Sequence, residues 1–145
     1  MNRIDSAIQL AVQAHFGQKD KIGQPVILHP LTVMLTVQPA NESNQIVSVL
    51  HDVLEDTVYS IGQIMEHVSL TDHEIEALNL LNHKRGDPYV NYVQRIKMSG
   101  NDIALSVKLA DIKHNAIRGH ESLPKDVSDR LKKKYEKAMA ILTEV

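Results

Sequence analysis

The run Val49-Leu50-His51-Asp52-Val53-Leu54-Glu55-Asp56-Thr57 is the most informative stretch of the chain. It lies at the end of an apolar segment, Asn44 to Leu54, which has the pattern of a buried helix. His51 and Asp52 place an imidazole beside a carboxylate, and two more acids follow within the next turn. Such side chains are costly to bury in an apolar stretch unless a charge compensates them. The run therefore predicts a metal site at the end of a helix.

Helical patterns account for most of the remaining chain, and no convincing strand or repeat is present. Apolar residues recur at helical spacing from Ile4 to His15, and Gly17 ends that helix. Only 3% of the residues are aromatic, so the core must consist of aliphatic side chains. We predict an all-α fold, with one compact domain over residues 1–145. Further helices are predicted after Pro30, from the capping boxes at Ser60 and Thr71, and over Tyr89–Met98, Asp102–Asn115 and Lys125–Leu142, with a loop over Gly119–Pro124.

Composition excludes several classes of protein. The chain has no cysteine, which excludes a disulfide framework or a thiolate zinc site and suits a reducing, cytoplasmic location. A formal net charge of -2 argues against a general nucleic-acid binder. Met1–Asp5 carries an acid where a signal peptide has its apolar run, and no apolar segment approaches the ~20 residues that span a bilayer. We predict a small-molecule partner, neither nucleic acid nor membrane, and leave oligomerisation open.

Two more candidate ligands come from other segments. His29 precedes Pro30, which favours an extended backbone and lets the imidazole project away from the helix that follows. Asp111 is another acid within an apolar stripe. With His51 and Asp52 these residues supply two imidazoles and two carboxylates, a set that suits Mn(II), Fe(II), Zn(II) or Ni(II) better than Ca(II) or Mg(II). A single histidine on an apolar face is more often a hydrogen-bonded core residue, so the hypothesis depends on the whole set.

Glu55 and Asp56 are the candidate catalytic acids. On a helix they lie four residues after His51 and Asp52, on the same sides as these two ligands. A carboxylate in that place can orient or deprotonate an attacking water and later protonate a leaving oxygen. The alternative is that they cap or solvate the helix end, but the helix dipole disfavours acids there. The misfit favours a catalytic function.

Lys108 and Asn115 flank Asp111 at i−3 and i+4, so both can share its face. Beside a metal they can hold phosphate and sugar oxygens. The alternative for Lys108 is a simple ion pair with a buried acid. His114 is one residue away from that face, and we expect it to be structural.

These residues fall in three ordered motifs that together resemble a known family. The segment from His15 to Pro30, the HD-x-x-ED-T run at 51–57 and the K-L-A-D-x-x-H-N run at 108–115 resemble the guanosine tetraphosphate (ppGpp) hydrolase domain of RelA/SpoT-type stringent-response proteins. That domain belongs to the HD superfamily of metal-dependent phosphohydrolases. The synthetase and regulatory domains of long members have no room in 145 residues, so the chain looks like the small stand-alone form, a single HD domain.

The resemblance implies a function and a set of roles. The nucleotide ppGpp or pppGpp loses its 3′-pyrophosphate, giving GDP or GTP and pyrophosphate, with manganese, Mn(II), as the expected ion. Glu55 and Asp56 handle the attacking water. Lys21 falls at a basic loop position near substrate, and Asn115 falls at a sugar-contacting position. By the same resemblance the metal ligands are His29, His51, Asp52 and Asp111.

Three positions depart from the family pattern and keep alternatives open. Asp20 stands where an arginine usually packs against the base, Val26 where a tyrosine is usual, and Arg118 where threonine is frequent. A carboxylate at position 20 is expected to repel phosphate. One alternative is therefore a phosphohydrolase for another nucleotide or phosphate ester. A second is a non-catalytic nucleotide-binding module, which Glu55 and Asp56 argue against. A third is an interaction domain that uses the basic last helix.

Overall fold

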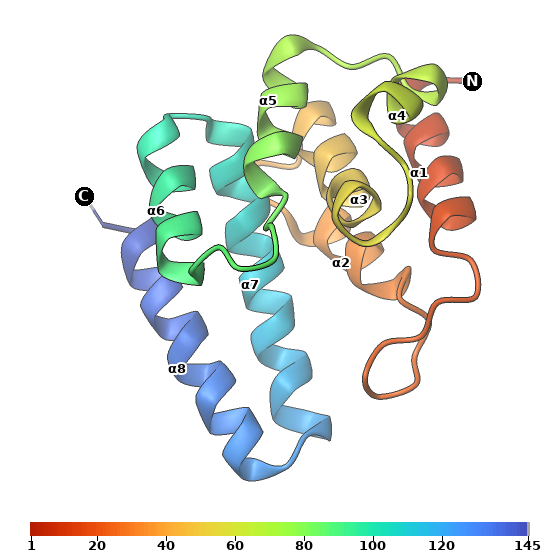
Figure 1. Cartoon of the computed structure of the whole chain (residues 1–145). Helices are drawn as coiled ribbons and strands as arrows, with labels where there is room; N and C mark the ends of the chain where they lie inside the picture. Colours follow the sequence, from red (N-terminus) through yellow and green to blue (C-terminus); the bar gives the residue numbers. More distant parts are fainter. Residues whose placement is uncertain (145) are drawn as a thin grey trace.

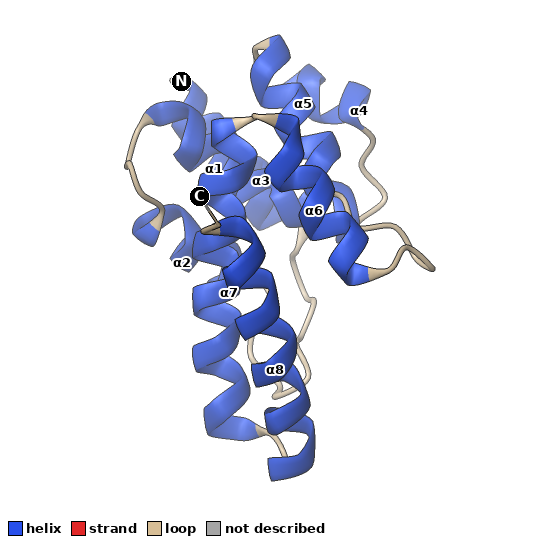
Figure 2. Ribbon diagram, turned by 90° about the vertical axis from the view of Figure 1, so that its left-hand side faces the viewer, coloured by secondary structure: helices blue, strands red, loops and turns tan. Residues whose placement is uncertain are grey.

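The computed structural model describes the backbone of residues 1–144 and the side chains of residues 1–118 and 123–144. Within this range the chain forms eight α-helices and no β-strand, which confirms the predicted all-α fold (Figures 1 and 2). The helices are α1 (Arg3–Ala14), α2 (Leu28–Thr36), α3 (Glu42–Asp56), α4 (Ile61–His67), α5 (Asp72–Leu81), α6 (Tyr89–Ser99), α7 (Asp102–Ser122) and α8 (Lys125–Leu142). No described helix has both the length and the apolar character needed to cross a membrane.

Helix α3 is the centre of the fold. It packs against α1, α2, α5 and α7 (Figure 1). Its residues from Ile46 to Val53 are all buried, so the helix has no solvent-facing side over two turns. A helix buried all round is usually apolar all round. The polar residues His51 and Asp52 inside this buried stretch therefore need partners from the surrounding helices.

Helix α7 is longer than the sequence predicts. It continues through the predicted loop at 119–124 as far as Ser122, about two turns beyond Asn115. Helix α7 packs against α8, and the pair projects away from the other helices (Figure 2). The extension adds Arg118 to the helix face that carries Asn115.

Helix α2 also differs from its prediction, because His29 lies inside its first turn and not in an extended segment before it. The backbone N–H groups of Leu28 and His29 donate to the carbonyls of Pro25 and Val26. Pro30 is tolerated there because a helix does not need the N–H groups of its first turn. By contrast, both predicted capping boxes, at Ser60 and Thr71, are present.

A buried ion pair fastens the amino-terminal helix to the rest of the domain. The carboxylate of Glu74 is fully buried and accepts two hydrogen bonds from Arg3, at 2.7 and 3.0 Å. It also accepts from the Ser43 hydroxyl and the Thr71 amide. Burial by itself raises the pKa of Glu74, but these hydrogen bonds outweigh it and lower the pKa to about 2. The ionised form of Glu74 thus stabilises the fold.

We expect Glu74→Gln to lower the free energy of unfolding at pH 7 by about 3 kcal/mol, because it leaves Arg3 without its buried partner. The stabilisation is fully present above pH ~4.5, the pKa of an unfolded glutamate, and is lost as the pH falls toward 2. Urea unfolding of both proteins between pH 7 and pH 3 measures it. Glu42→Gln is the matched control, since Glu42 also binds Arg3 but its side chain is 55% exposed. An equal loss in both variants would contradict the prediction.

Candidate metal centre

The four predicted metal ligands come together from three helices. His29 lies on α2, His51 and Asp52 on α3, and Asp111 on α7. All four are buried, with relative exposures of 5%, 3%, 8% and 5% in that order. These three helices pack against one another in every pairwise combination. The core of the fold therefore builds the site, and no exposed loop contributes one of the four.

The ligand atoms converge on one carboxylate oxygen. Oδ1 of Asp111 lies 2.7 Å from Nε2 of His29 and 3.4 Å from Nε2 of His51. The Asp52 carboxylate lies 3.2 Å from Nε2 of His51 and 3.8 Å from Nε2 of His29. Ligand atoms of His29, His51 and Asp111 all lie within 4.8 Å of one another. Ligand atoms this close together can bind the same ion.

The donor chemistry also fits a cation. Nδ1 of His51 donates to the Ser48 carbonyl at 2.5 Å, so the neutral ring presents a lone pair at Nε2. That Nε2 atom is buried and has no hydrogen-bond partner. Asp52 and Asp111 outweigh the effect of burial and raise the pKa of His51 to about 10. The surroundings of His51 thus stabilise positive charge. A divalent ion can supply that charge in place of the proton on the ring.

His114, expected to be structural, supports the ligand His29. The Nδ1 atoms of the two rings lie 2.7 Å apart, and the rings stack. Burial, with the charges of His29 and Arg118, lowers the pKa of His114, which keeps its ring neutral. One ring must donate and the other accept; with Nδ1 of His29 as the donor, the lone pair at its Nε2 would be available to an ion shared with Asp111. Such partners fix the orientation of metal-binding imidazoles.

Lys108 is an ion-pair partner of the site. Its ammonium donates to Oδ2 of Asp111 at 2.8 Å, on the side away from the imidazoles, and lies over the rings of Tyr89 and Tyr92. Despite burial, Asp111 raises the pKa of Lys108 well above its usual value. Lys108 and the histidines in turn hold the pKa of Asp111 well below its usual value. The sequence left two alternatives for Lys108, a contact with substrate oxygens and an ion pair with a buried acid. The ion pair matches this geometry.

Glu55 and Asp56 lie on the last turn of α3, and their carboxylates cluster with that of Asp52. Burial and the charges of Asp52 and Asp56 raise the pKa of Glu55 to about 7. Burial and Asp52 also raise the pKa of Asp56. The backbone N–H of His83 donates to Oε1 of Glu55 at 3.0 Å and fixes its direction. An acid with a pKa near neutrality is suited to proton transfer at physiological pH.

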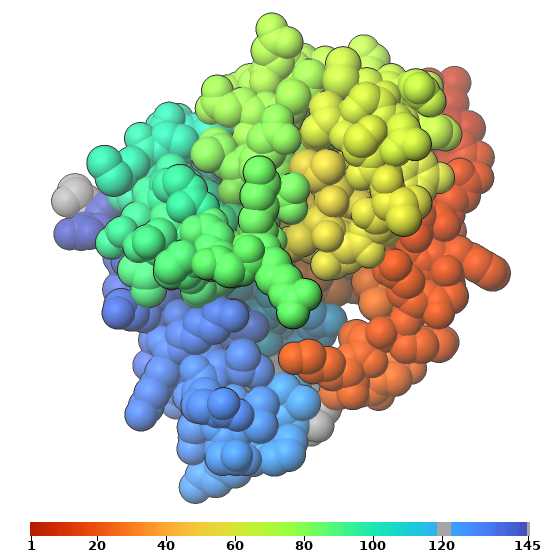
Figure 3. All heavy atoms as spheres, viewed as in Figure 1, coloured from red at the N-terminus to blue at the C-terminus, as the bar shows by residue number. Residues whose placement is uncertain are grey.

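The predicted substrate contacts Lys21 and Asn115 lie beside a pocket of about 400 Å³ next to this site. The pocket lies between the loop before α2 and helices α7 and α8, on the hollowed face in Figure 3. Asn115 connects it to the metal centre, because its amide donates to Oδ1 of Asp111 at 3.3 Å. Lys108 is absent from the lining. The contacts of Lys21, Lys108 and Asn115 with substrate stay predictions.

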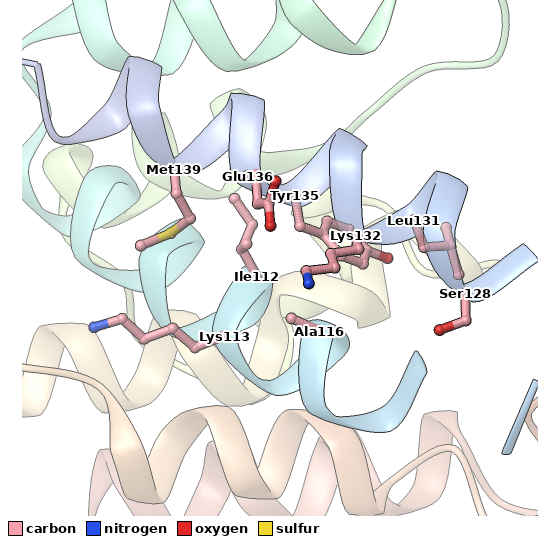
Figure 4. A pocket seen from close by; sticks show the side chains of 9 residues that line it. All are labelled: Ile112, Lys113, Ala116, Ser128, Leu131, Lys132, Tyr135, Glu136 and Met139. Atoms are coloured by element: carbon pink, nitrogen blue, oxygen red, sulfur yellow. The ribbon is translucent and has the colours of Figure 1, made fainter. Parts of the chain in front are cut away.

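A second hollow, of about 360 Å³, lies between α7 and α8 (Figure 4). Its lining includes the apolar side chains of Ile112 and Met139, and none of the four ligands borders it. It shares Leu131 and Tyr135 with the pocket beside Asn115. The two hollows thus lie against the same stretch of α8.

Sequence reasoning did not assign roles to several residues near the site. His83 orients Glu55 through its backbone, and Tyr89 packs between the ammonium groups of Lys108 and Lys134. Of the chain's four tyrosines, three gather around these lysines. Only Tyr135 is next to one of them in sequence, so the sequence gives no signal for Tyr89 and Tyr92. Arg118 was noted only as a departure from the family pattern.

Comparison with known proteins extends these observations. No family model matches the chain. It is 32% identical over 139 residues to the guanosine-3′,5′-bis(diphosphate) 3′-pyrophosphohydrolase of Borreliella burgdorferi and 33% identical over 133 residues to that of Haemophilus influenzae. These alignments cover 90% and 86% of this chain but only 21% and 20% of the relatives, so the chain spans about a fifth of their length.

The fold has a close counterpart among solved structures. A metazoan ortholog of SpoT that hydrolyses ppGpp superposes with a TM-score of 0.85, over 99% of this chain and 87% of the other, at 18% identity. At that identity the likeness concerns the fold. Over most of its length the chain is thus similar in sequence to two bacterial proteins named ppGpp 3′-pyrophosphohydrolases, and it shares the fold of the solved structure.

Proposed function

We propose that this protein is a metal-dependent phosphohydrolase that removes the 3′-pyrophosphate of ppGpp or pppGpp and releases GDP or GTP. The observation that carries the proposal is the convergence of two imidazoles and two carboxylates beside Glu55, an acid whose pKa is about 7. The names of the bacterial relatives support the choice of substrate. The mixed nitrogen and oxygen ligands support Mn(II), and the lack of cysteine supports a cytoplasmic location.

His29, His51, Asp52 and Asp111 are the residues that would hold the ion. When bound, a divalent ion polarises a phosphoryl oxygen and makes a water more acidic. Lys108 keeps Asp111 ionised from the opposite side, so the ligand stays an anion throughout the working pH range. The basic side chains Lys21 and Lys134, near the adjoining pocket, attract the phosphates of the nucleotide.

Glu55 is placed to move the proton. Held by the His83 amide, its carboxylate accepts a proton from the water that attacks the phosphorus next to the ribose. The bond from that phosphorus to the ribose 3′ oxygen breaks, and the pair Glu55 and Asp56 returns a proton to the leaving oxygen. The products are the 3′-hydroxyl nucleotide and pyrophosphate. A module that only binds nucleotide has no need of such a pair.

Release of pyrophosphate from ppGpp tests the proposal. We expect turnover with added Mn(II), and we expect its loss in Asp52→Asn, which keeps the size of the side chain but removes its charge. Removal of metal with a chelator should stop the wild-type reaction, and Mn(II) should restore it. A folded, metal-loaded wild-type protein that releases no pyrophosphate would refute ppGpp as substrate.

A second candidate function is hydrolysis of another nucleotide or phosphate ester at the same site. The observation that favours it is the replacement of the usual basic residue by Asp20 beside the pocket. A panel of nucleoside phosphates, assayed under the same conditions, separates the two functions.

A further inference from the structure

The extension of α7 builds a chain of polar contacts from the metal centre to the adjoining pocket. Asn115 donates to Asp111 through its amide nitrogen and accepts from Nη2 of Arg118 through its amide oxygen, at 2.6 Å. Nη1 of Arg118 then contacts the Asp20 carboxylate at 3.4 Å. The guanidinium is therefore held from both ends, by α7 and by the loop before α2.

Asp20 is itself fixed by the loop that carries it. Its Oδ1 accepts the backbone N–H groups of Ile22 and Gln24, at 3.0 and 2.9 Å, and leaves Oδ2 for Arg118. The sequence predicts a carboxylate that repels phosphate, whereas the structure shows one paired with a cation and two amides. The pocket thus contains a guanidinium, that of Arg118 on α7, although position 20 of the loop carries a carboxylate.

The guanidinium of Arg118 has donors to spare. Of its five N–H groups, two are used by Asn115 and Asp20, which leaves three. One of these is on Nε, which is buried and has no hydrogen-bond partner. The other two are one N–H on each of Nη1 and Nη2, and a ligand in the pocket that Arg118 lines can accept from these.

The pocket that Arg118 lines has the size and surface of a site for a planar, partly polar ligand. Its volume of about 400 Å³ lies within the range of small-molecule sites, about 300–1,000 Å³. The lining combines the apolar side chains Ile22 and Leu131 and the ring of Tyr135 with Asn115 and Arg118. Lys19, Lys21 and Lys134 add positive charge for the phosphates of the same ligand.

We propose that Arg118, clamped by Asp20 and Asn115, selects the nucleobase of the substrate by donating hydrogen bonds to the acceptor edge of guanine. Guanine presents two acceptors, O6 and N7, to a guanidinium, whereas adenine presents an amino donor in place of O6. The inference rests on the proposed function, to which it adds a residue that determines specificity. The guanidinium that the family pattern places at position 20 is supplied here from position 118, where threonine is frequent in the family.

Steady-state kinetics with two substrates tests the inference. We expect Arg118→Gln to lower kcat/KM for ppGpp by roughly 10- to 100-fold, mainly through KM, and to leave kcat/KM for the adenosine 3′,5′-bis(diphosphate) nearly unchanged. Arg130→Gln is the matched control, because Arg130 is an exposed guanidinium on α8 outside the pocket. An equal fall for both substrates, or no fall, would overturn the inference.

Arg118→Lys separates edge recognition from charge. Lysine keeps the charge but lacks the planar fork of donors. We therefore expect Arg118→Lys to lack the preference for guanine, as Arg118→Gln does. Full preference in the lysine variant would show that charge alone suffices and would contradict the proposed contact.

Binding measurements keep the inference separate from the proposed reaction. If the wild-type protein hydrolyses neither nucleotide, the proposed function fails, and calorimetric titration with GDP and ADP takes over as the test. Tighter binding of GDP than of ADP, abolished in Arg118→Gln, would support the role of Arg118. Equal binding of both nucleotides by the wild-type protein would refute it.

Discussion

Asp111→Ala is expected to abolish stoichiometric binding of a divalent metal. Oδ1 of Asp111 lies close to both imidazoles, and its removal takes away the ligand on which His29 and His51 converge. The protein should also lose about 3–5 kcal/mol of stability, because Lys108 is left as a buried ammonium without its partner. Metal content after dialysis against Mn(II), measured by mass spectrometry, and urea unfolding test the two effects.

A double variant distinguishes loss of a ligand from loss of the fold. Adding Lys108→Met to Asp111→Ala removes the unpaired ammonium, so it should restore much of the stability but none of the metal binding. Asp129→Ala, at an exposed position on α8, is the control for removal of a carboxylate. A double variant that still holds one Mn(II) per chain would show that the predicted ligand set is wrong.

Glu55→Gln is expected to lower kcat about 10²- to 10⁴-fold and to leave metal content unchanged. The amide side chain can still accept the His83 N–H, so its position is kept, but it cannot take a proton from water. Because the substrate still binds, KM should change little. Pyrophosphate release under saturating ppGpp measures the loss of kcat.

The matched control is Glu66→Gln, an exposed glutamate on α4. It should retain wild-type kcat. Two outcomes would contradict the assignment of Glu55 as the proton acceptor. One is a Glu55→Gln protein with nearly full activity, and the other is one that has lost its metal, which would make Glu55 a ligand instead.

Local pattern was sufficient to predict the helices that carry the site. The caps at Ser60 and Thr71 depend on residues three apart, so they can be found in the sequence. Helix α7 packs against α8, and local propensity contains no information on such a contact. The sequence predicts a helix that ends at Asn115 and a loop over Gly119–Pro124, and the helical position of Arg118 came only from the structure.

The sequence by itself determined the all-α class, the candidate ligands and the acids beside them, because residue type and helical spacing define these features. The tertiary structure decided which charges meet. Asp20 meets Arg118 across 98 positions of sequence. The backbone of His83 reached Glu55 from 28 positions away. The physical reason is that burial makes each charge depend on its neighbours in space, and those neighbours are set by the packing of α2, α3, α7 and the loops between helices.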